Sequence, residues 1–328
     1  MDRRAFLLAL SAAAAASRWA HAAEDGAVPT VAVLAVTRAV NFKPRADAFR
    51  RGMQELGYVE GKTIAYQWRY ANDDYARLDD LAREIAGLRP AVALADSSQT
   101  SVRLRQAGGA LAIVMAASDD PAGSRLVQTL DKPGTRLTGL STGNPDEILK
   151  AVDFLARVVP KGAGVAVLIN QNNALYRKIR ARFRHAALGG GLKYAMIDAN
   201  QPGEIAAALD SAFRKERAAG LVVMSDAMFY DERSRIVKRV AAARRAAIYP
   251  DPAYVAAGGL MSYGADIEAN FVRAASYVDR ILRGAAPGDL PVEEPKEYRL
   301  VINRRTARAM GIAIPDAMLK DARTVIGT

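Results

Sequence analysis

Short apolar runs rich in β-branched residues alternate with amphipathic helix patterns along most of this chain, and this alternation limits the folds open to it. The first run, Val31 to Val36, is continuously apolar, as expected of a strand buried on both faces of a parallel sheet. The next segment places Ala46, Phe49 and Met53 on one helical face before Gly57 ends the helix. Repeated strand and helix units of this kind predict an α/β fold with doubly wound, Rossmann-like sheets.

The alternation occurs as two series. In the first series we expect strands at 31–36, 63–68, 91–95 and 111–116. The segment 137–141 is interpreted as a crossing, because a second complete series begins after it. In the second series we expect strands at 165–169, 193–197, 220–224 and 247–249, with helices around 175–188, 204–218 and 232–245 between them. No fixed-period sequence repeat is present, which predicts two similarly built lobes and not a solenoid.

The stretch Gly258 to Gly264 is a short apolar strand signal between glycines, and we interpret it as the second crossing. The helix expected at 267–283 should pack its apolar face on the first lobe, before the chain recrosses ahead of 300–302. The predicted division gives lobe 1 residues 23–140 and 265–298, gives lobe 2 residues 141–264 and 299–328, and places a ligand cleft between the lobes.

The first 22 residues are predicted to be an export signal and not part of the fold. The segment Asp2 to Leu8 carries paired arginines and resembles the twin-arginine consensus, and an apolar run from Ala5 to Ala16 overlaps and follows it. Ala20 to Ala22 has the small-x-small pattern of a signal peptidase site, so we expect the mature chain to begin at Ala23. The apolar run has 12 residues, fewer than the roughly 18 that span a bilayer, so an uncleaved anchor is the weaker alternative.

The chain has no cysteine, which removes the lipid-attachment residue of a surface lipoprotein together with disulfides, thiolate metal sites and a cysteine nucleophile. Of the two histidines, His21 lies in the predicted signal and His185 lies among arginines on a predicted helix. Neither a Gly-x-Ser-x-Gly elbow nor a P-loop is present. We therefore expect a soluble protein without metal, cofactor or catalytic residues.

The formal net charge is +11, and it becomes +9 without the predicted signal, which contains three basic residues and one acidic residue. The densest basic run, 177–184, overlaps an apolar stripe in which Leu175, Ile179 and Phe183 recur every four residues. The arginines then occupy the solvent-facing arc of a helix, and no aromatic residue lies between them on that face. This pattern argues against nucleic-acid binding.

Polar residues follow several of the predicted strands, at the edge where an open parallel sheet binds its ligand. They are Thr37, Arg38, Ser97, Ser98, Ser118 and Asp119 in the first lobe, and Asn170, Asn172 and Asp226 in the second. Both sets line one cleft if the lobes face each other. Each residue type also has a structural explanation, because Ser and Asp cap helices and Asn forms Asx turns.

Asp226 is the most informative of these residues, because it follows an apolar strand and precedes the aromatic pair Phe229 and Tyr230. A carboxylate in that position could hold a ligand ammonium or hydroxyl, with helix capping as the competing role. Arg38 is expected to pair with a ligand carboxylate, and Phe229 or Tyr263 to cover an apolar part of the ligand. Tyr176, on the helix expected around 175–188, is a further candidate for ligand contact.

Seven motifs occur in order along the chain. They are Phe49 to Lys62, Ser118 to Pro121, Thr138 to Ser141, Gly258 to Gly264, Asp289 to Glu293, Leu300 to Asn303 and Ala309 to Pro315. This succession resembles the ABC transporter substrate-binding protein family, whose characterised relatives include tryptophan and tyrosine binders. The matches extend over essentially the whole predicted mature chain.

The resemblance implies a type I periplasmic binding protein, in which two lobes joined by three crossing segments close on a ligand by bending at a hinge. Ser141, Ser262 and Gly264 are the hinge candidates near the crossings. The resemblance also implies a periplasmic protein that delivers a small-molecule ligand to an ABC permease in the inner membrane, and we expect it to be a monomer.

The resemblance does not identify the ligand, which we expect to be small and polar or amino-acid-like, with an aromatic ligand among the possibilities. Two other classes of protein stay open. A periplasmic sensor subunit would use the same fold and cleft but present its closed form to a membrane receptor kinase. An enzyme has less support, because no activated nucleophile or phosphate-binding loop is visible.

Overall fold

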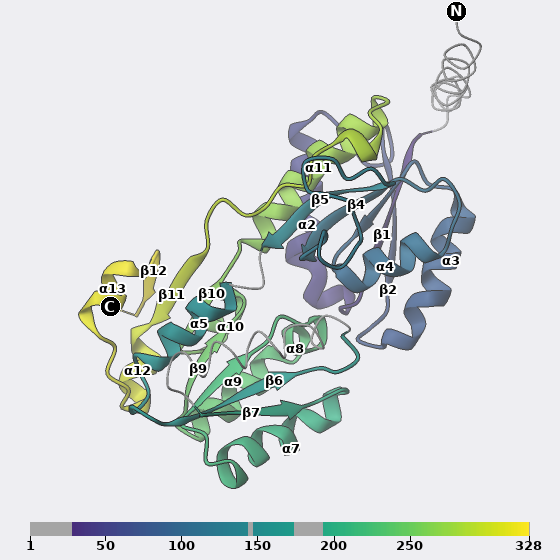
Figure 1. The fold of residues 1–328 in the computed structure, drawn as a ribbon. Helices are drawn as coiled ribbons and strands as arrows, with labels where there is room; N and C mark the ends of the chain where they lie inside the picture. The colour runs from purple at the N-terminus through teal and green to yellow at the C-terminus, as the bar shows by residue number, and fades with distance from the viewer. Residues whose placement is uncertain (1–27, 144–146, 174–192, 328) are drawn as a thin grey trace, which may run out of the picture.

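The structure, a computed structural model, describes residues 28–143, 147–173 and 193–327, and these residues form two α/β lobes (Figure 1). The predicted signal and the helix expected around 175–188, which carries Tyr176 and His185, lie outside the described residues. Within the described ranges, no helix combines the length and apolarity needed to cross a membrane.

Lobe 1 is built on a five-stranded sheet with the order β2-β1-β3-β4-β5, in which all neighbouring strands are parallel. Its strands are β1 (Thr30–Ala35), β2 (Ala65–Tyr70), β3 (Val92–Ala95), β4 (Ile113–Asp119) and β5 (Leu137–Gly143). Its helical elements are α2 (Ala39–Glu55), η2 (Tyr75–Arg77), α3 (Leu78–Leu88), α4 (Ser98–Gln106), α11 (Ile267–Leu282) and η5 (Pro287–Asp289).

Strand β1 shows why the first apolar run is continuous. Val31 and Val33 belong to the core cluster under α2 and α11, whereas Ala32 and Leu34 belong to the cluster under α3 and α4. Successive side chains of a strand point to opposite faces, so a strand covered by helices on both faces must be apolar at every position.

Lobe 2 is built on a seven-stranded sheet with the order β12-β11-β10-β9-β8-β6-β7, parallel except where β10 meets β11. Its strands are β6 (Gly164–Ile169), β7 (Lys193–Asp198), β8 (Gly220–Val223), β9 (Ala246–Tyr249), β10 (Met261–Gly264), β11 (Arg299–Asn303) and β12 (Thr324–Ile326). Its helical elements are α5 (Glu147–Ala156), η3 (Pro202–Glu204), α7 (Ile205–Asp210), η4 (Ser211–Lys215), α8 (Ala227–Asp231), α9 (Arg233–Ala242), α10 (Pro252–Ala256), α12 (Arg304–Met310) and α13 (Asp316–Asp321).

Three segments connect the two sheets. The chain leaves the first sheet after β5, returns to it between β10 and α11, and reaches the second sheet again at β11 (Figure 1). Helix α11 packs on α2 of lobe 1, with the rings of Phe42 and Phe271 5.4 Å apart between centroids. Helix α11, which covers most of the expected 267–283 helix, therefore packs against the helix that follows the first strand.

Two expected elements differ from the structure. The segment 137–141 is not only a crossing, because it lies within β5, which pairs in parallel with β4 as an edge strand. The second strand begins at Ala65 and not at Thr63, because the Thr63 side chain accepts a hydrogen bond from the Val59 backbone N–H at 2.8 Å and closes a turn there.

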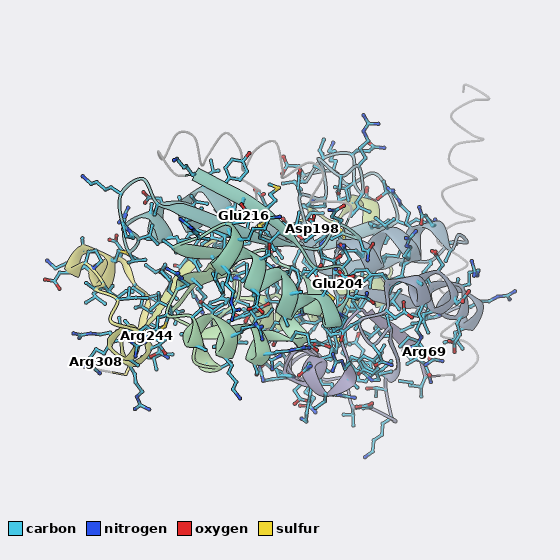
Figure 2. All side chains as sticks on the ribbon, turned by 90° about the horizontal axis from the view of Figure 1, so that it is seen from below. Arg69, Asp198, Glu204, Glu216, Arg244 and Arg308 are labelled. Carbon is cyan, nitrogen blue, oxygen red and sulfur yellow. The ribbon has the colours of Figure 1, made fainter. Side chains whose placement is uncertain are left out.

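Charged side chains of both signs are distributed over both lobes (Figure 2). Arg69 lies on lobe 1, and exposed Asp198, Glu216 and Arg244 lie on lobe 2. Interspersed charge of this kind agrees with a solvated surface and not with one basic face for a polyanion.

Candidate ligand-binding site

A pocket of about 190 Å³ lies where the carboxyl ends of the parallel strands of the two sheets face each other. Asp96, Ser97, Asp119 and Thr142 of lobe 1 line it, and so do Asp226 and several tyrosines of lobe 2. Ligands of open α/β sheets bind at this edge, so the pocket is the candidate site.

Asp226 of lobe 2 is the most heavily hydrogen-bonded carboxylate of the pocket. It caps α8 by accepting the Met228 N–H at 3.0 Å, so the capping role is real. It also accepts hydrogen bonds from the side chains of Asn170 at 3.3 Å and Asn173 at 3.4 Å. Its Oδ2 accepts a fourth from the Tyr75 hydroxyl of lobe 1 at 3.0 Å, which makes Asp226 a contact between the lobes.

Burial controls the protonation of Asp226. It raises the pKa of this carboxyl to about 6, because removal from water penalises the charged form more than the hydrogen bonds from Asn170, Tyr75 and Asn173 favour it. All of these donors are neutral. The protein therefore supplies hydrogen bonds to the carboxylate but no positive charge to balance it.

Asp119 lines the pocket from the end of β4, and its carboxylate accepts a hydrogen bond from the Thr142 hydroxyl. Burial raises the pKa of Asp119 as well. Ser98 and Ser118 support this corner from behind, since their hydroxyl oxygens are 3.1 Å apart and Ser98 Oγ accepts the Asp119 N–H at 2.9 Å. These two serines position Asp119 and do not line the pocket.

Ser97 caps α4. Its hydroxyl accepts the Thr100 N–H at 3.4 Å, and Thr100 Oγ1 accepts the Ser97 N–H at 3.0 Å, which completes a capping box. Asp96 accepts the Thr100 hydroxyl at 3.0 Å and the Val36 N–H at 3.0 Å. Both Asp96 and Ser97 also line the pocket, so a structural role and a ligand-facing position coincide here.

The two candidate asparagines, Asn170 and Asn172, have different surroundings in the structure. Asn170 forms an Asx turn, because its side-chain oxygen accepts the Asn172 N–H at 3.0 Å, while its amide donates to Asp226. Asn172 is exposed and donates to the Asn200 carbonyl at 3.2 Å, away from the pocket. Asn173, which sequence reasoning did not select, lines the pocket instead.

Tyrosines supply much of the pocket wall. Tyr263 is stacked on Tyr298 with ring centroids 5.8 Å apart, and Tyr249 is stacked on Tyr254 at 4.9 Å. Tyr230 meets the Tyr254 ring edge-on at 6.4 Å. All five line the pocket, so the aromatic surface expected beside Asp226 is present but consists mainly of residues that were not predicted.

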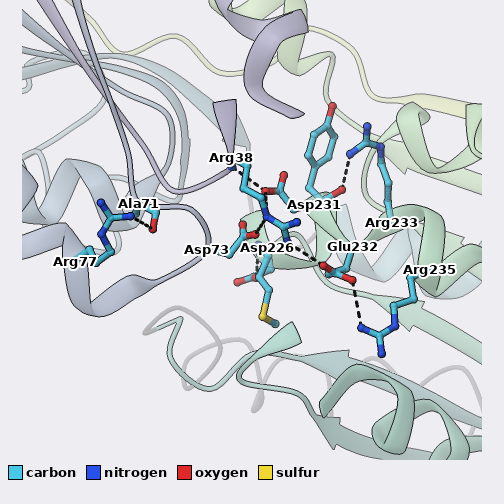
Figure 3. Close-up of polar contacts among 11 residues, drawn as sticks. Arg38, Ala71, Asp73, Arg77, Asp226, Asp231, Glu232, Arg233 and Arg235 are labelled. Carbon is cyan, nitrogen blue, oxygen red and sulfur yellow. Dashed lines mark hydrogen bonds and ion pairs between the residues drawn. The ribbon is translucent and has the colours of Figure 1, made fainter. Parts of the chain in front are cut away.

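Arg38 does not line the pocket. It belongs to what we call the rim cluster, which consists of Arg38 and Asp73 of lobe 1 and Asp231 and Glu232 of lobe 2 (Figure 3). The Arg38 side chain donates to Asp73 at 2.7 Å and to Glu232 at 2.9 Å, and its backbone N–H donates to Asp231 at 2.8 Å. The expectation that Arg38 binds a ligand carboxylate is corrected, because carboxylates of the protein occupy its guanidinium.

Two carboxyl groups of the rim cluster lie within hydrogen-bond reach of each other. As carboxylates, Asp73 and Asp231 each leave one buried oxygen without a donor among the described residues. Burial and the neighbouring Asp73 raise the pKa of Asp231 to about 7, and burial also raises that of Asp73. A proton shared by the two groups would satisfy both oxygens.

Two other candidates lie away from the pocket. The ring of Phe229 is 0 % exposed and packs in the core of lobe 2, because α8 turns the third residue after Asp226 away from the pocket. Thr37 is equally buried at the end of β1, and its hydroxyl has no partner among the described residues. The expectation that Phe229 covers a ligand is therefore corrected.

The hinge candidates have different surroundings. Ser262 lies inside the second sheet, in register with Tyr249 and Val301, and Ser141 accepts the Gly143 N–H through its hydroxyl at 2.8 Å. Gly264 is the last residue of β10, where a Cβ atom would lie 2.0 Å from the Pro250 carbonyl oxygen. Close approach of two backbones therefore requires glycine at 264.

Besides Asn173 and most of the tyrosines, sequence reasoning missed Arg45, Tyr75, Asp96 and Asp251. Asp96 and Asp251 directly follow β3 and the Tyr249-Pro250 end of β9, so the rule that selected Ser97 would have found both. Arg45 lies on α2 and Tyr75 on η2, and neither carries a local signal that points to the pocket. Among the described residues no group of three or more His, Cys, Asp or Glu side chains could hold a metal ion.

Two α/β lobes that face each other across a pocket and are joined by three segments are the fold of the type I periplasmic binding proteins. The chain belongs to the family described as ABC transporter substrate binding protein, whose sequence model matches residues 30–326. The predicted fold and family are both confirmed.

The relatives share a low sequence identity with this chain, but the similarity covers most of its length. A "Tyrosine-binding protein" of Clostridioides difficile strain R20291 is 24% identical over 264 residues, which cover 80% of this chain and 75% of that protein. The ABC domain of Streptococcus pneumonia in complex with L-Trp is 23% identical, with a TM-score of 0.83 over 92% of this chain and 100% of that one. A conserved domain protein of Vibrio cholerae O1 biovar El Tor is 27% identical, with a TM-score of 0.84 over 91% and 100%.

Proposed function

We propose that this chain is the periplasmic solute-binding component of an ABC importer. It captures a small polar or amino-acid-like ligand between its lobes and delivers it to a permease in the inner membrane. The observation that carries the proposal is the 3.0 Å hydrogen bond from Tyr75 in lobe 1 to Asp226 in lobe 2, a carboxylate that lines the pocket. A ligand at Asp226 would touch both lobes, so its binding would favour the arrangement with the lobes in contact.

In this proposal each group has one role. Asp226 accepts hydrogen bonds from the ligand, Tyr263 covers an apolar part, and the rim cluster holds the lobes together instead of holding a ligand carboxylate. Bending at the crossings near Gly264 opens the pocket. One relative is named as a tyrosine-binding protein and another was solved in complex with L-Trp, which supports an aromatic ligand.

Native mass spectrometry of freshly purified protein, followed by a thermal-shift screen of amino acids, amines and aromatic acids, tests the proposal. We expect a retained small molecule and a strong stabilisation by one ligand class. Asp226→Ala should abolish most of that affinity in titration calorimetry. Absence of any bound or stabilising solute would overturn the proposal.

The proposed location and partner need separate experiments. The proposal has residues 1–22 act as a twin-arginine type signal that is removed on export, which leaves a soluble monomer; N-terminal sequencing of the periplasmic fraction tests this. Crosslinking of the ligand-loaded protein in membranes should capture a permease, whereas capture of a receptor kinase would favour a sensor subunit. Recovery of the bound solute unchanged after long incubation is expected of a protein that is not an enzyme.

A further inference from the structure

The pocket has an excess of negative groups. The described residues that line it include four carboxylates, Asp96, Asp119, Asp226 and Asp251, and one guanidinium, that of Arg45. Four carboxylates against one guanidinium leave a surplus of three negative charges when all are ionised. These groups come from both lobes, so the surplus concentrates where the lobes meet.

The single guanidinium is already engaged. Arg45 lies 3.7 Å from the Asp251 carboxylate, and its guanidinium carbon lies 4.2 Å from the centre of the Tyr230 ring. It therefore pairs with Asp251, stacks on one aromatic face, and through its charge also favours the ionised form of Asp96. A ligand carboxylate would have to compete with Asp251 for it.

The other three carboxylates form no ion pair among the described residues, although the charge of Arg45 favours the ionised form of Asp96. Asp96 accepts hydrogen bonds from Thr100 and Val36, Asp119 from Thr142, and Asp226 from neutral side chains and a backbone N–H. Burial raises the pKa of all three. A positive group brought into the pocket would offset this penalty on their charged forms.

The aromatic wall adds an independent feature that points to a ligand. The side chain of Tyr254 lines the pocket and is 0 % exposed, yet its hydroxyl has no hydrogen-bond partner among the described residues. Tyr249, Tyr254, Tyr263 and Tyr298 line the same pocket as the carboxylates, as two stacked pairs. Carboxylates together with aromatic faces are the surroundings that favour an ammonium ion.

We infer that the pocket takes a small amine with a net positive charge and no carboxylate, in preference to a zwitterionic amino acid. This inference rests on the proposed function and narrows its ligand class. The ammonium lies at Asp226 within reach of the pocket carboxylates, and the tyrosines contact the body of the ligand. A cavity of about 190 Å³ limits the ligand to a small molecule, since a cavity of roughly 150 Å³ holds benzene.

A ligand carboxylate is disfavoured for a specific reason. It would enter a site in which no nearby cation compensates Asp119 and Asp226 and in which the guanidinium of Arg45 is already engaged, and like charges brought together at a desolvated site repel strongly. The distinction is therefore one of charge and not of size, because an amine and the matching amino acid share the same ring or chain.

Titration calorimetry with matched ligands tests the inference. The pairs are tryptamine and L-tryptophan, tyramine and L-tyrosine, and cadaverine and L-lysine, with indole-3-acetate as an anion of similar shape. We expect the best-binding amine to bind at least about tenfold more tightly than its amino acid, and the anion to show no binding. Asp226→Asn, which keeps the side-chain size and the helix cap, should weaken that amine by at least about tenfold.

Asp266→Asn is the matched control, because Asp266 caps α11 by accepting the Ala269 N–H and does not line the pocket. It should leave the amine affinity unchanged. An amino acid that binds as tightly as its amine would overturn the inference and leave the proposed function intact. Failure of every compound to bind, together with a protein that retains no small molecule in native mass spectrometry, would overturn both.

Discussion

The rim cluster and the pocket both place several carboxylates and one arginine between the lobes. At the rim, Arg38 contacts Asp73 of its own lobe and Asp231 and Glu232 of the other lobe. In the pocket, Arg45 pairs with Asp251 and stacks on Tyr230, and the remaining carboxylates accept hydrogen bonds from neutral donors. The two regions therefore differ in the origin of their counter-charge.

This difference separates two tasks that one interface has to perform. The rim cluster is completed by the protein itself as soon as the lobes meet, so it adjusts how readily the lobes come together. The pocket keeps carboxylates without an ion pair after the lobes meet, and in our inference a cationic ligand supplies the missing charge. Arginine suits the rim because its planar fork can donate to several carboxylates at once.

The largest expected effect is that of Arg38→Ala. It removes the only cation of the rim cluster and leaves Asp73 and Asp231 buried without compensation. We expect a loss of about 2 kcal/mol in the contact between lobes, less than for a fully buried pair, because the Arg38 side chain is 42% exposed. Small-angle scattering of the ligand-free protein should show a larger radius of gyration.

Arg50→Ala is the control for this variant, because the Arg50 pair with Glu60 at 3.1 Å lies entirely within lobe 1. It should leave the scattering curve unchanged. Identical curves for Arg38→Ala and the parent protein would show that the rim cluster does not hold the lobes together.

The next effect is a response of the rim cluster to pH. The pKa of Asp231 is about 7 with the lobes in contact, against roughly 4 for a free Asp, so bringing the lobes together takes up a proton. Contact between the lobes is then strongest below about pH 4 and weakens, by at most about tenfold per pH unit, as pH rises to about 7. Scattering between pH 5 and 8 measures this, and Asp231→Asn should remove it.

The groups around Asp231 decide the interpretation of that experiment. They are Arg38 and Asp73 from lobe 1, with Glu232 and its partner Arg235 from lobe 2. The pocket should respond in the opposite sense, because the pKa of Asp226 is about 6 and an ammonium ion needs its ionised form. In the Asp231→Asn background, amine affinity should rise with pH up to about 6; a flat profile would contradict the role of Asp226.

Tyr75→Phe has a smaller expected effect and acts on a contact between the lobes that ends on the pocket carboxylate Asp226. It removes the 3.0 Å hydrogen bond to Asp226, a loss of about 1 kcal/mol or fivefold in ligand affinity. Because this hydrogen bond favours the charged form, the pKa of Asp226 should also rise. The pH above which amine affinity stops rising should therefore be higher in Tyr75→Phe than in the parent protein. If this pH is the same in both, Tyr75 only packs against the carboxylate.

The smallest expected effect is that of Glu232→Gln. Its partner Arg38 is partly exposed and keeps Asp73 and Asp231, and the glutamine oxygen can still accept a hydrogen bond. We expect a change of less than about 0.5 kcal/mol in the contact between lobes, as for most exposed ion pairs. A loss as large as that of Arg38→Ala would show that Glu232, and not Asp231, is the main partner of Arg38 across the lobes.

The fold was predictable because its signals are local. Continuous apolar runs such as Val31 to Val36 and Val165 to Ile169 indicate strands covered on both faces, and the structure places β1 and β6 there. The shift of the second strand to Ala65 and the inclusion of 137–141 in β5 depend on a turn hydrogen bond and on an edge pairing, which periodicity does not report.

The candidate site was predictable only where strand ends supply it. Asp119 and Asp226 were selected because they follow strands, and both line the pocket, although their contact with a ligand stays a prediction. Tyr75 and Asp226 lie 151 positions apart, so no local pattern connects them. Phe229 was misplaced because adjacency to Asp226 in sequence does not specify which way a short helix turns its side chains.

Tyr298 gives the crossings a mechanical property. Its hydroxyl donates to the Thr142 carbonyl at 3.1 Å and fills the space beside Gly143, where a Cβ atom would lie 1.2 Å from it. Two crossing segments that are 156 positions apart are thereby fastened together at one point. Any rotation of one lobe relative to the other then has its axis close to this hydrogen bond, so the relative motion of the lobes has few independent degrees of freedom. With few degrees of freedom, the lobes of a ligand-free chain would move apart and together along a restricted set of conformations. Ligand binding would then cost less conformational entropy.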